Sequence, residues 1–556
     1  ASAYLRAKED YLMGINFSRL LTLKYGNSIS NYLHTKYAVV SVGRVMTCVL
    51  GMVVRREREI RDFVKTPFYR VLSTIDVSGQ TFEGEWRAVK GSRYFESFDL
   101  YKENGFKERK KAEELISYLE EKQPMECEIV SIEKKKEKKN PPLLYNLAEL
   151  QNDCSKRFKI SPDETLRIVQ ELYEKKLVTY PRTDARVLST AVAKEIGHNL
   201  NGLMKYPMAV PYLQEIVKFG THKGLAKTRY VNDKQITDHY AIIPTGQGIA
   251  ALKSVSLTAG KVYDCIVRRF LSIFYPPAQY DNAKLVVQVE NECFYTSAKV
   301  LKEPGYLEVA TPPKKKSFEE ENSRVLGGAS VQSNESDEES DEPKVNPKAL
   351  IELAGSIKAG DDISVMGYSI KFGKTSPPKR YTSGSMVLAM ENAGQLIEDE
   401  ELREQIKGSG IGTSATRAEI IKKLVRIGYL NLNKKTQVLT PENLGEMVYE
   451  VVNMTVPALL NPKMTASWEK GLDGITQGTV PMEDYREKLE EFIRKETVSM
   501  INENLTSQIA GQIRPLAGSN AKDMKARVKI GATCPVCPSM AILSMRSDSK
   551  PLSAEV

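Results

Sequence analysis

The chain has 556 residues, is 41% hydrophobic and 27% charged, and carries 80 Lys and Arg against 71 Asp and Glu, a net charge of +9. This length predicts several domains, and the composition is ordinary for a water-soluble globular protein. The mild basic excess permits a nucleic-acid partner without arguing for one. The sequence has no apolar run that could span a bilayer, no signal-peptide pattern and no disulfide framework, so we expect a reducing, cytoplasmic setting without a membrane anchor.

The first part of the chain changes from a helical to a strand pattern. Residues 1–65 repeat apolar side chains every three or four positions, which predicts helices. Residues 66–142 contain short β-branched runs, typical of strands, around one helix at 111–121. They end in a lysine-rich segment, 133–142, that we interpret as a linker.

The same alternation continues to the end. Residues 143–265 are predicted to be helical, and 266–384 return to strands around a low-complexity insertion at about 312–347. The insertion has too few apolar residues to order itself, although an acidic tail that competes with DNA is an alternative interpretation. Residues 385–505 are again helical, and 506–556 are polar and irregular. One β region interrupted by a helical domain explains this order best, which predicts a multidomain α+β fold.

Two segments resemble helix-turn-helix units. The first, residues 161–186, opens with a capping box at Ser161 and proline at the first helical position. Its helix is predicted to reach about residue 176 and to carry four inward apolar side chains, Leu166, Val169, Leu172 and Tyr173. Pro181 disfavours the helical region for Tyr180, so an extended segment should follow, with Arg182 on the same side as Tyr180.

The second unit is residues 413–440. A capping box from Thr416 to Glu419 begins a helix, and two short alternating strands around a polar turn follow. A helix followed by a β wing is the winged-helix pattern, which is common in DNA-binding proteins. Each unit alone is more often a plain structural helix pair. Two such units in one chain, both with basic residues at the edge, modestly favour a nucleic-acid partner.

Tyr180 is a candidate nucleophile. An ordinary tyrosine phenol is hardly ionised at neutral pH, so it needs help to attack. A guanidinium such as that of Arg182 would favour the phenolate and neutralise a phosphate under attack. His239, one of only four histidines, could hold a phosphate oxygen or relay a proton. The alternative is that both the tyrosine and the histidine are packing residues.

Seven motifs resemble those of type IA DNA topoisomerases, and the bacterial-type topoisomerase III branch most closely. The resemblance as a whole runs from Arg6 to about Lys495. In chain order they are RAKEDYLMGINFSRLLT (6–22), SVGRVMTCVLGMVVRRE (41–57), PPLLYNLAELQ (141–151), LVTYPRTDARVL (177–188), DHYAIIPT (238–245), GIGTSATRAEIIKKL (410–424) and MTASWEKGL (464–472). Each motif is moderately specific, and their shared order makes chance resemblance negligible.

The resemblance implies a toroidal core with two winged-helix (CAP-like) domains and a β-rich arch. Residues 1–65 and 385–505 would form domain IV, 66–142 and 266–384 domain II, the arch, and 143–265 domain III with the active-site tyrosine.

The resemblance also implies a reaction. Tyr180 would attack single-stranded DNA and form a 5′-phosphotyrosyl bond, and a strand would pass through the gap before religation. This would relax negative supercoils and decatenate DNA without ATP, in agreement with the absence of a P-loop motif. Arg182 and His239 would act at the scissile phosphate. The DNA groove and active-site wall would include Arg6, Asp10, Arg44, Thr416 and Arg417.

Type IA enzymes resembling this chain use Mg²⁺ bound by a Toprim domain with a D-x-D pair. The sequence contains no D-x-D pair, so we expect this chain to lack the N-terminal Toprim domain and its metal ligands, and to bind single-stranded DNA with little or no relaxation. CPVC (534–537) looks like half a zinc ribbon, and because no second pair follows, stable zinc binding is not expected.

Partners and alternatives follow from the same resemblance. It implies a monomer that binds single-stranded DNA, with a RecQ-type helicase as a candidate partner. The alternative is a non-catalytic single-stranded DNA clamp. Tyrosine recombinases and rolling-circle relaxases fit poorly, because the H-x-x-R and H-x-H patterns that they need are missing.

Overall fold

The structure is a computed structural model. It describes residues 2–555 except for 78, 122–126, 237, 312–345, 358–362, 394–409, 519–526, 534–539 and 546–550. The predicted insertion, apart from residues 346 and 347, and the CPVC pair therefore lie outside the described residues. The chain divides into two compact units, each described by itself: Ala1–Arg58, Gln151–Thr165 and Arg380–Val556 form the first, and Glu59–Leu150 and Leu166–Lys379 form the second.

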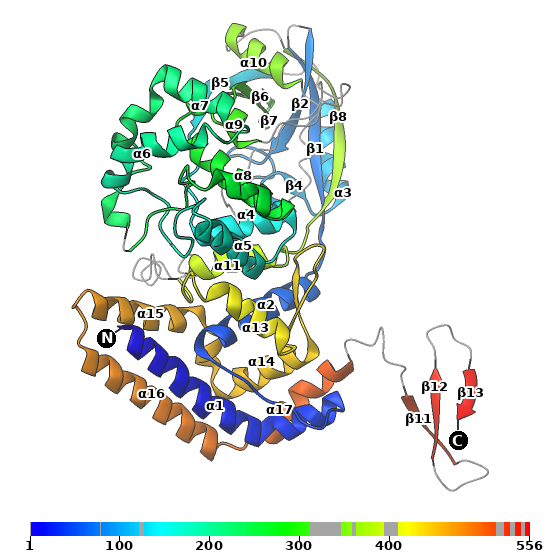
Figure 1. Cartoon of the computed structure of the whole chain (residues 1–556). Helices are drawn as coiled ribbons and strands as arrows, with labels where there is room; N and C mark the ends of the chain where they lie inside the picture. Colours follow the sequence, from blue (N-terminus) through cyan, green and yellow to red (C-terminus); the bar gives the residue numbers. More distant parts are fainter. Residues whose placement is uncertain are drawn as a thin grey trace. The chain divides into compact units, whose positions relative to one another are not determined.

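The first unit is built mainly of helices. They are α1 (Ser2–Leu33), α2 (Arg44–Arg61), α11 (Ser383–Glu391), α13 (Arg417–Arg426), α14 (Asn443–Thr455), α15 (Pro462–Thr476), α16 (Met482–Asn502) and α17 (Thr506–Ile513). Helix α1 packs against α14, α15, α16 and α17 (Figure 1). Its buried stripe includes Leu5, Met13, Phe17 and Leu21, as the helical periodicity predicts. Segments from the two ends of the chain thus share one core.

The winged-helix pattern after α13 is confirmed. Strands β9 (Leu430–Leu432) and β10 (Leu439–Pro441) follow the helix and pair antiparallel. The predicted capping box at Thr416 is wrong, because Thr416 makes no side-chain cap and has helical backbone angles, φ −110° and ψ −22°. Its hydroxyl instead accepts from Thr413 N at 3.1 Å, so it points back to the preceding turn and not forward to the first helical N–H groups.

The second unit contains an eight-stranded sheet of order β3-β4-β1-β2-β7-β6-β5, with β8 paired to β1. The strands are β1 (Pro67–Val77), β2 (Gln80–Arg87), β3 (Leu100–Lys102), β4 (Gly105–Phe106), β5 (Cys127–Lys139), β6 (Ala278–Val289), β7 (Glu292–Glu303) and β8 (Ile363–Lys374). Strands from before and after the helical segment pair along β5 and β6, which confirms one interrupted β region. The core includes Trp86, Phe106 and Phe294, and helices α3 (Arg109–Glu121) and α10 (Pro347–Ser356) pack against it.

The interpretation of 133–142 as a linker is wrong for residues 133–139. Strand β5 continues to Lys139, and its lysines pair in register with β6, for example Lys135 with Asn282. Backbone pairing with β6 overrides the weak strand propensity of lysine, and lysines are favourable on an edge strand because they discourage pairing with other chains.

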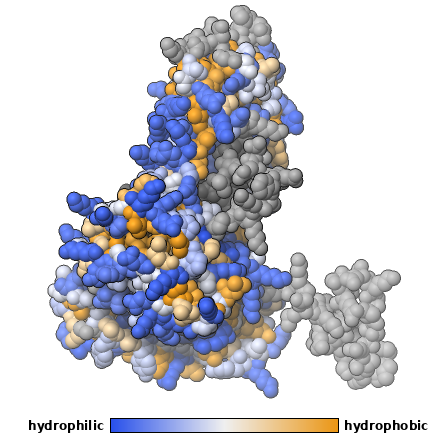
Figure 2. Space-filling view, turned by 45° about the horizontal axis from the view of Figure 1, so that its top comes forward, coloured by the Kyte–Doolittle hydropathy of each residue, from blue (hydrophilic) through white to orange (hydrophobic). Residues whose placement is uncertain are grey.

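The helical segment inserted between β5 and β6 carries the candidate site. It contains α4 (Leu147–Phe158), α5 (Pro162–Glu174), α6 (Thr190–Leu203), α7 (Val210–Phe219) and α8 (Leu257–Ser272), and α9 (Leu307–Ala310) follows β7. Helix α5 begins as predicted, with Glu164 N donating to Ser161 Oγ at 3.2 Å. Hydrophobic side chains are scattered among hydrophilic ones over the face in view in Figure 2. Within the described part of the chain, no helix has the length and apolar character needed to cross a membrane.

Candidate active site

The backbone beside Tyr180 is fixed by a second segment, residues 241–245. Thr179 donates from its backbone N to Ile243 O at 3.0 Å and from its hydroxyl to Ala241 O at 3.1 Å. These bonds hold the DHYAIIPT motif beside the LVTYPRTD motif, although the two are far apart in the sequence. Tyr180 therefore extends from a braced backbone, which is a requirement for a side chain that must meet a reacting atom accurately.

The Tyr180 ring lies between two other rings. Its centroid is 4.2 Å from that of His239, with the planes tilted by 39°, and 5.5 Å from that of Tyr173, with the planes at 83°. The Thr183 hydroxyl donates to His239 O at 3.0 Å and so ties the histidine backbone to the tyrosine segment. The structure thus brings together two of the three predicted catalytic side chains.

A cavity of about 580 Å³ opens at this point. Its lining residues are Tyr173, Glu174, Lys176, Val178, Thr179, Tyr180, His239, Tyr240, Thr245 and Gln247. Tyr180 is half-buried and His239 is exposed, so both can meet a molecule that enters. Burial raises the pKa of the Tyr240 hydroxyl above its ordinary value, which keeps it protonated and able to donate a hydrogen bond.

Arg182 is exposed, but the alternation of side chains that predicted it on the same side as Tyr180 does not apply here. Thr183 N donates to Pro181 O at 3.0 Å, which closes a tight turn directly after Tyr180. The alternation of an extended strand cannot be applied across such a turn. Backbone geometry therefore gives no reason for Tyr180 and Arg182 to lie on the same side. The role of Arg182 stays a prediction.

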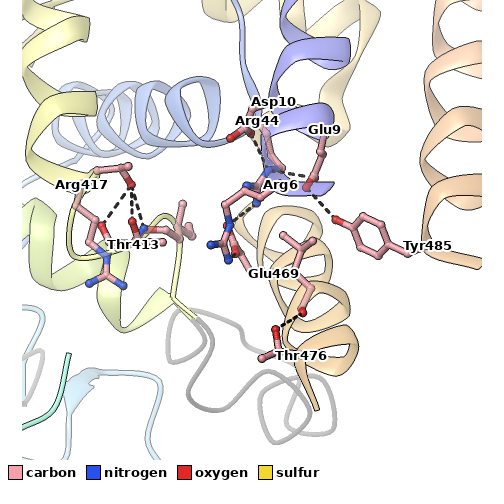
Figure 3. A network of polar contacts seen from close by, with 12 residues as sticks. Arg6, Glu9, Asp10, Arg44, Thr413, Arg417, Glu469, Thr476 and Tyr485 are labelled. Atoms are coloured by element: carbon pink, nitrogen blue, oxygen red, sulfur yellow. Dashed lines mark hydrogen bonds and ion pairs between the residues drawn. The ribbon is translucent and has the colours of Figure 1, made fainter. Parts of the chain in front are cut away.

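In the first unit, three predicted DNA-binding residues meet in one polar cluster, which we call the Arg44 cluster: Arg6, Glu9, Asp10, Arg44 and Glu469 (Figure 3). Arg44 Nε lies 3.1 Å from Glu9 Oε1 and 3.3 Å from Asp10 Oδ1. Arg44 Nη1 donates to Glu469 Oε1 at 2.7 Å, and Arg6 Nη2 donates to Glu469 Oε2 at 2.6 Å. Glu469 therefore bridges both arginines.

The members of the Arg44 cluster differ in their access to solvent. The Arg44 side chain is only 1% exposed, whereas those of Arg6 and Asp10 are 31% and 50% exposed. A phosphate could reach Arg6 without rearrangement, but Arg44 is enclosed by carboxylates. Burial by itself would lower the pKa of Arg44, but Glu9, Glu469 and Asp10 outweigh it and raise that pKa above its ordinary value.

Glu9 is a member that the sequence analysis missed. It lies on the buried stripe of α1 between Leu5 and Met13, four residues from each, and an acidic residue at such a position was the available signal. Burial raises the pKa of Glu9 to about 7, against the lowering effects of Arg44 and of the Tyr485 hydroxyl, which donates to it at 2.8 Å. Glu9 Oε1 is within ion-pair distance of Arg44 but makes no aligned hydrogen bond.

Thr416 and Arg417 lie together at the start of α13. Thr416 is exposed, whereas Arg417 is only 4% exposed and its Nε donates to Ile411 O at 3.3 Å. Figure 3 shows Arg417 apart from the Arg44 cluster. The guanidinium groups of Arg44 and Arg417 are thus engaged inside the first unit, and their contact with DNA stays a prediction.

The residues around Tyr180 do not fit a magnesium site. Mg²⁺ prefers several oxygen ligands in octahedral geometry, and Glu174 is the single acidic residue among those lining the cavity. Across the residues that the structure describes, no group of three or more His, Cys, Asp or Glu is placed to hold a metal ion.

Comparison with known proteins shows the family from the sequence and a similar fold from the structure. The sequence model of the family described as DNA topoisomerase matches residues 1–487. The chain is 30% identical to DNA topoisomerase 3 of Bacillus licheniformis over 540 residues, 96% of this chain and 63% of the relative. It is 31% identical to the Bacillus subtilis protein of that name and 32% identical to the Shouchella clausii one, covering 91% of this chain and 62% of the relative in each case. In fold it resembles full-length topoisomerase I of Thermotoga maritima, with a TM-score of 0.54 at 19% identity over 98% of this chain and 73% of that one.

The chain therefore belongs to the DNA topoisomerase family. These relatives are named DNA topoisomerase 3, so the chain is topoisomerase III-like, as its type IA motifs indicated. The chain spans a little over three fifths of the length of these curated relatives.

Proposed function

We propose that this chain forms the nucleophile-bearing part of a topoisomerase III-like enzyme that cleaves and religates single-stranded DNA through Tyr180. The observation that supports this most directly is the position of Tyr180. Its ring lies in an open cavity against His239, on a backbone braced by a second motif of the family. A nucleophile with an adjacent proton-handling group is the arrangement that covalent catalysis requires.

The reaction balances without an external energy source. The Tyr180 oxygen attacks the phosphorus of a DNA phosphodiester, the new phosphotyrosyl O–P bond forms, and the bond from phosphorus to the 3′ oxygen breaks. The phenolic proton is given up and the 3′ oxygen gains one, so a free 3′-hydroxyl results. Attack by that hydroxyl on the phosphotyrosyl bond reverses the step, and because one ester replaces another, no ATP is needed. Passage of another strand through the gap before religation would relax negative supercoils and decatenate DNA.

His239 and Arg182 have separate proposed roles. His239 is exposed and lies against the Tyr180 ring, so it can hold a phosphate oxygen or carry a proton between the tyrosine and the 3′ oxygen. Arg182 is an exposed guanidinium in the turn after Tyr180, and it would neutralise charge on the phosphate. The residues that line the cavity do not fit Mg²⁺, and we derive no step through it.

A trapping experiment tests this function. The chain is incubated with a single-stranded oligonucleotide and Mg²⁺, with and without the N-terminal part of a topoisomerase 3 relative, and stopped with detergent. A label at the 3′ end should remain with the protein and a label at the 5′ end should not, because the tyrosine keeps the 5′ phosphate. Tyr180→Phe is the control and should form no adduct. Binding without any adduct, even with the added part, would favour the alternative of a non-catalytic clamp.

The oligomeric state, the cellular location and the partner are proposed from the family to which the chain belongs. We expect a monomer that acts on DNA in the cytoplasm, with a RecQ-type helicase as a partner that supplies single strands. Sedimentation of the purified chain tests the first expectation, and co-purification with such a helicase tests the second.

A further inference from the structure

Tyr173 is not the core residue that its helical position predicts. Its side chain is 39% exposed and lines the cavity, although its neighbour Leu172 is fully buried. The cause is the end of α5. Lys176 has a positive φ of 59°, and Lys176 N and Leu177 N donate to Tyr173 O and Leu172 O at 2.8 and 2.9 Å. This is a Schellman ending, which turns the chain sharply and leaves Tyr173 at the rim of the packed core.

A second part of the cavity wall, the loop that contains Gln247, is equally well fixed. Gln247 lies between Gly246 and Gly248, which adopt φ values of 76° and 66°. A Cβ on Gly248 would meet Lys175 O at 2.2 Å, so the loop lies directly against the end of α5. Close approach of backbone to backbone requires glycine here. The helix end and the loop therefore form one rigid rim around the cavity.

The cavity has the wrong chemistry for a phosphate alone. Its lining includes three tyrosine rings and the His239 ring, whereas Lys176 is the single Lys or Arg among its lining residues. Its volume of about 580 Å³ is in the range of small-molecule sites. Aromatic walls with a few polar groups are how proteins bind unstacked bases of single strands.

We propose that this cavity accepts one unstacked base of the DNA strand, from a nucleotide next to the phosphate that Tyr180 attacks. Tyr173 is the stacking surface, because its side chain is exposed, whereas Tyr180 and Tyr240 are half-buried and Tyr180 has His239 against its ring. The carboxylate of Glu174 and the amide of Gln247 lie at the polar rim. A carboxylate accepts from an amino group and an amide pairs with adenine, so adenine and cytosine should be preferred over thymine. The location of this nucleotide rests on the proposed function, but its binding does not.

Fluorescence anisotropy with labelled oligo-dT measures this binding directly. One dA, one dC or one abasic residue is placed at successive positions along the oligonucleotide. At one position, the base should tighten binding relative to the abasic residue, and Tyr173→Ala should weaken binding of that oligonucleotide about 5- to 100-fold. Tyr173→Phe should stay within about 2-fold, since the ring remains. Phe219→Ala removes a 70% exposed ring outside the cavity and should have no effect.

The outcomes separate the base site from the nucleophile. If Tyr180→Phe loses the adduct but keeps the base-dependent affinity, both proposals stand. If the wild-type chain forms no adduct and Tyr173→Ala still weakens binding, the base site stands and the proposed reaction falls. If an abasic residue binds as well as a base at every position, the base site is overturned whatever the adduct assay gives. If Tyr173→Ala does not fold, Glu174→Ala and Gln247→Ala test the base site instead. An unchanged preference for dA and dC over dT in these variants would also overturn the base site.

Discussion

The Tyr180 cavity and the Arg44 cluster are two very different environments for residues predicted to serve one reaction. The cavity is open, and its main contacts are between rings. At the centre of the Arg44 cluster, by contrast, the guanidinium is 1% exposed and in ion-pair contact with three carboxylates. A group in the first environment can meet a substrate as it stands, whereas a group in the second mainly holds helices together. Motif membership alone does not tell these roles apart.

The largest effect should come from Tyr180→Phe. Removing the nucleophilic oxygen should reduce adduct formation at least about 1000-fold, because the covalent bond to DNA forms through that oxygen. Because the ring and its contacts with His239 and Tyr173 remain, the thermal midpoint should change little. The adduct assay checks the loss of the covalent bond, and a calorimetric scan on the same protein sample checks the thermal midpoint. Residual adduct at more than a few per cent of wild type would show that another residue attacks.

Arg44→Ala should act in the opposite way, on stability. It leaves Glu9 and Glu469 buried without their common partner, which typically costs about 3–5 kcal/mol. Urea unfolding should show this loss, and Arg19→Ala, an exposed arginine of α1, should lie within about 0.5 kcal/mol of wild type. If Arg44→Ala is as stable as Arg19→Ala but binds an oligonucleotide much more weakly than Arg19→Ala does, Arg44 contacts DNA directly. The contrast between the two regions would then fail.

His239→Ala should lower the rate of adduct formation by about 100-fold, the lower end of what a positioned acid or base contributes. Stability should hardly change, because the side chain is exposed. Single-turnover cleavage of a labelled oligonucleotide measures the rate. His239→Gln keeps a hydrogen-bonding group, so rescue by this variant would indicate that His239 holds the phosphate and does not transfer a proton.

The smallest effect concerns the pH dependence of stability through Glu9. Its folded-state pKa of about 7 lies above the ordinary value of 4.5, so the folded state binds the additional proton. The stabilisation is fully present below about pH 4.5 and is lost as pH rises through 7. The facing groups are Arg44 on α2, Tyr485 on α16, Asp10 on α1 and Glu469 on α15, of which Arg44 and Tyr485 oppose the shift.

Glu9→Gln isolates this group, because glutamine resembles the protonated acid. The variant should match wild type in unfolding free energy at pH 5 and exceed it by about 1–3 kcal/mol at pH 8. Equal stability of the two proteins at both pH values would mean that Glu9 is ionised throughout, held by Arg44.

The sequence by itself determined the order of the elements. Apolar periodicity located α1 and its buried stripe, and β-branched runs located β1, β6 and β7. The serine and proline at 161 and 162 located the start of α5, and the strands after α13 located the wing. These features depend on interactions within a few residues, so a local pattern is sufficient to predict them.

Only the tertiary structure decided which of these side chains are free to act. Tyr173 has the spacing of a core residue but lines the cavity, because α5 ends beside it, whereas Leu172 is fully buried. Arg44 has the charge of a DNA-binding residue but is enclosed by carboxylates from α1 and α15. The lysines of β5 have the composition of a linker but pair with β6. For Arg44 and the lysines of β5 the partner comes from a distant part of the chain, and such partners leave no local pattern in the sequence.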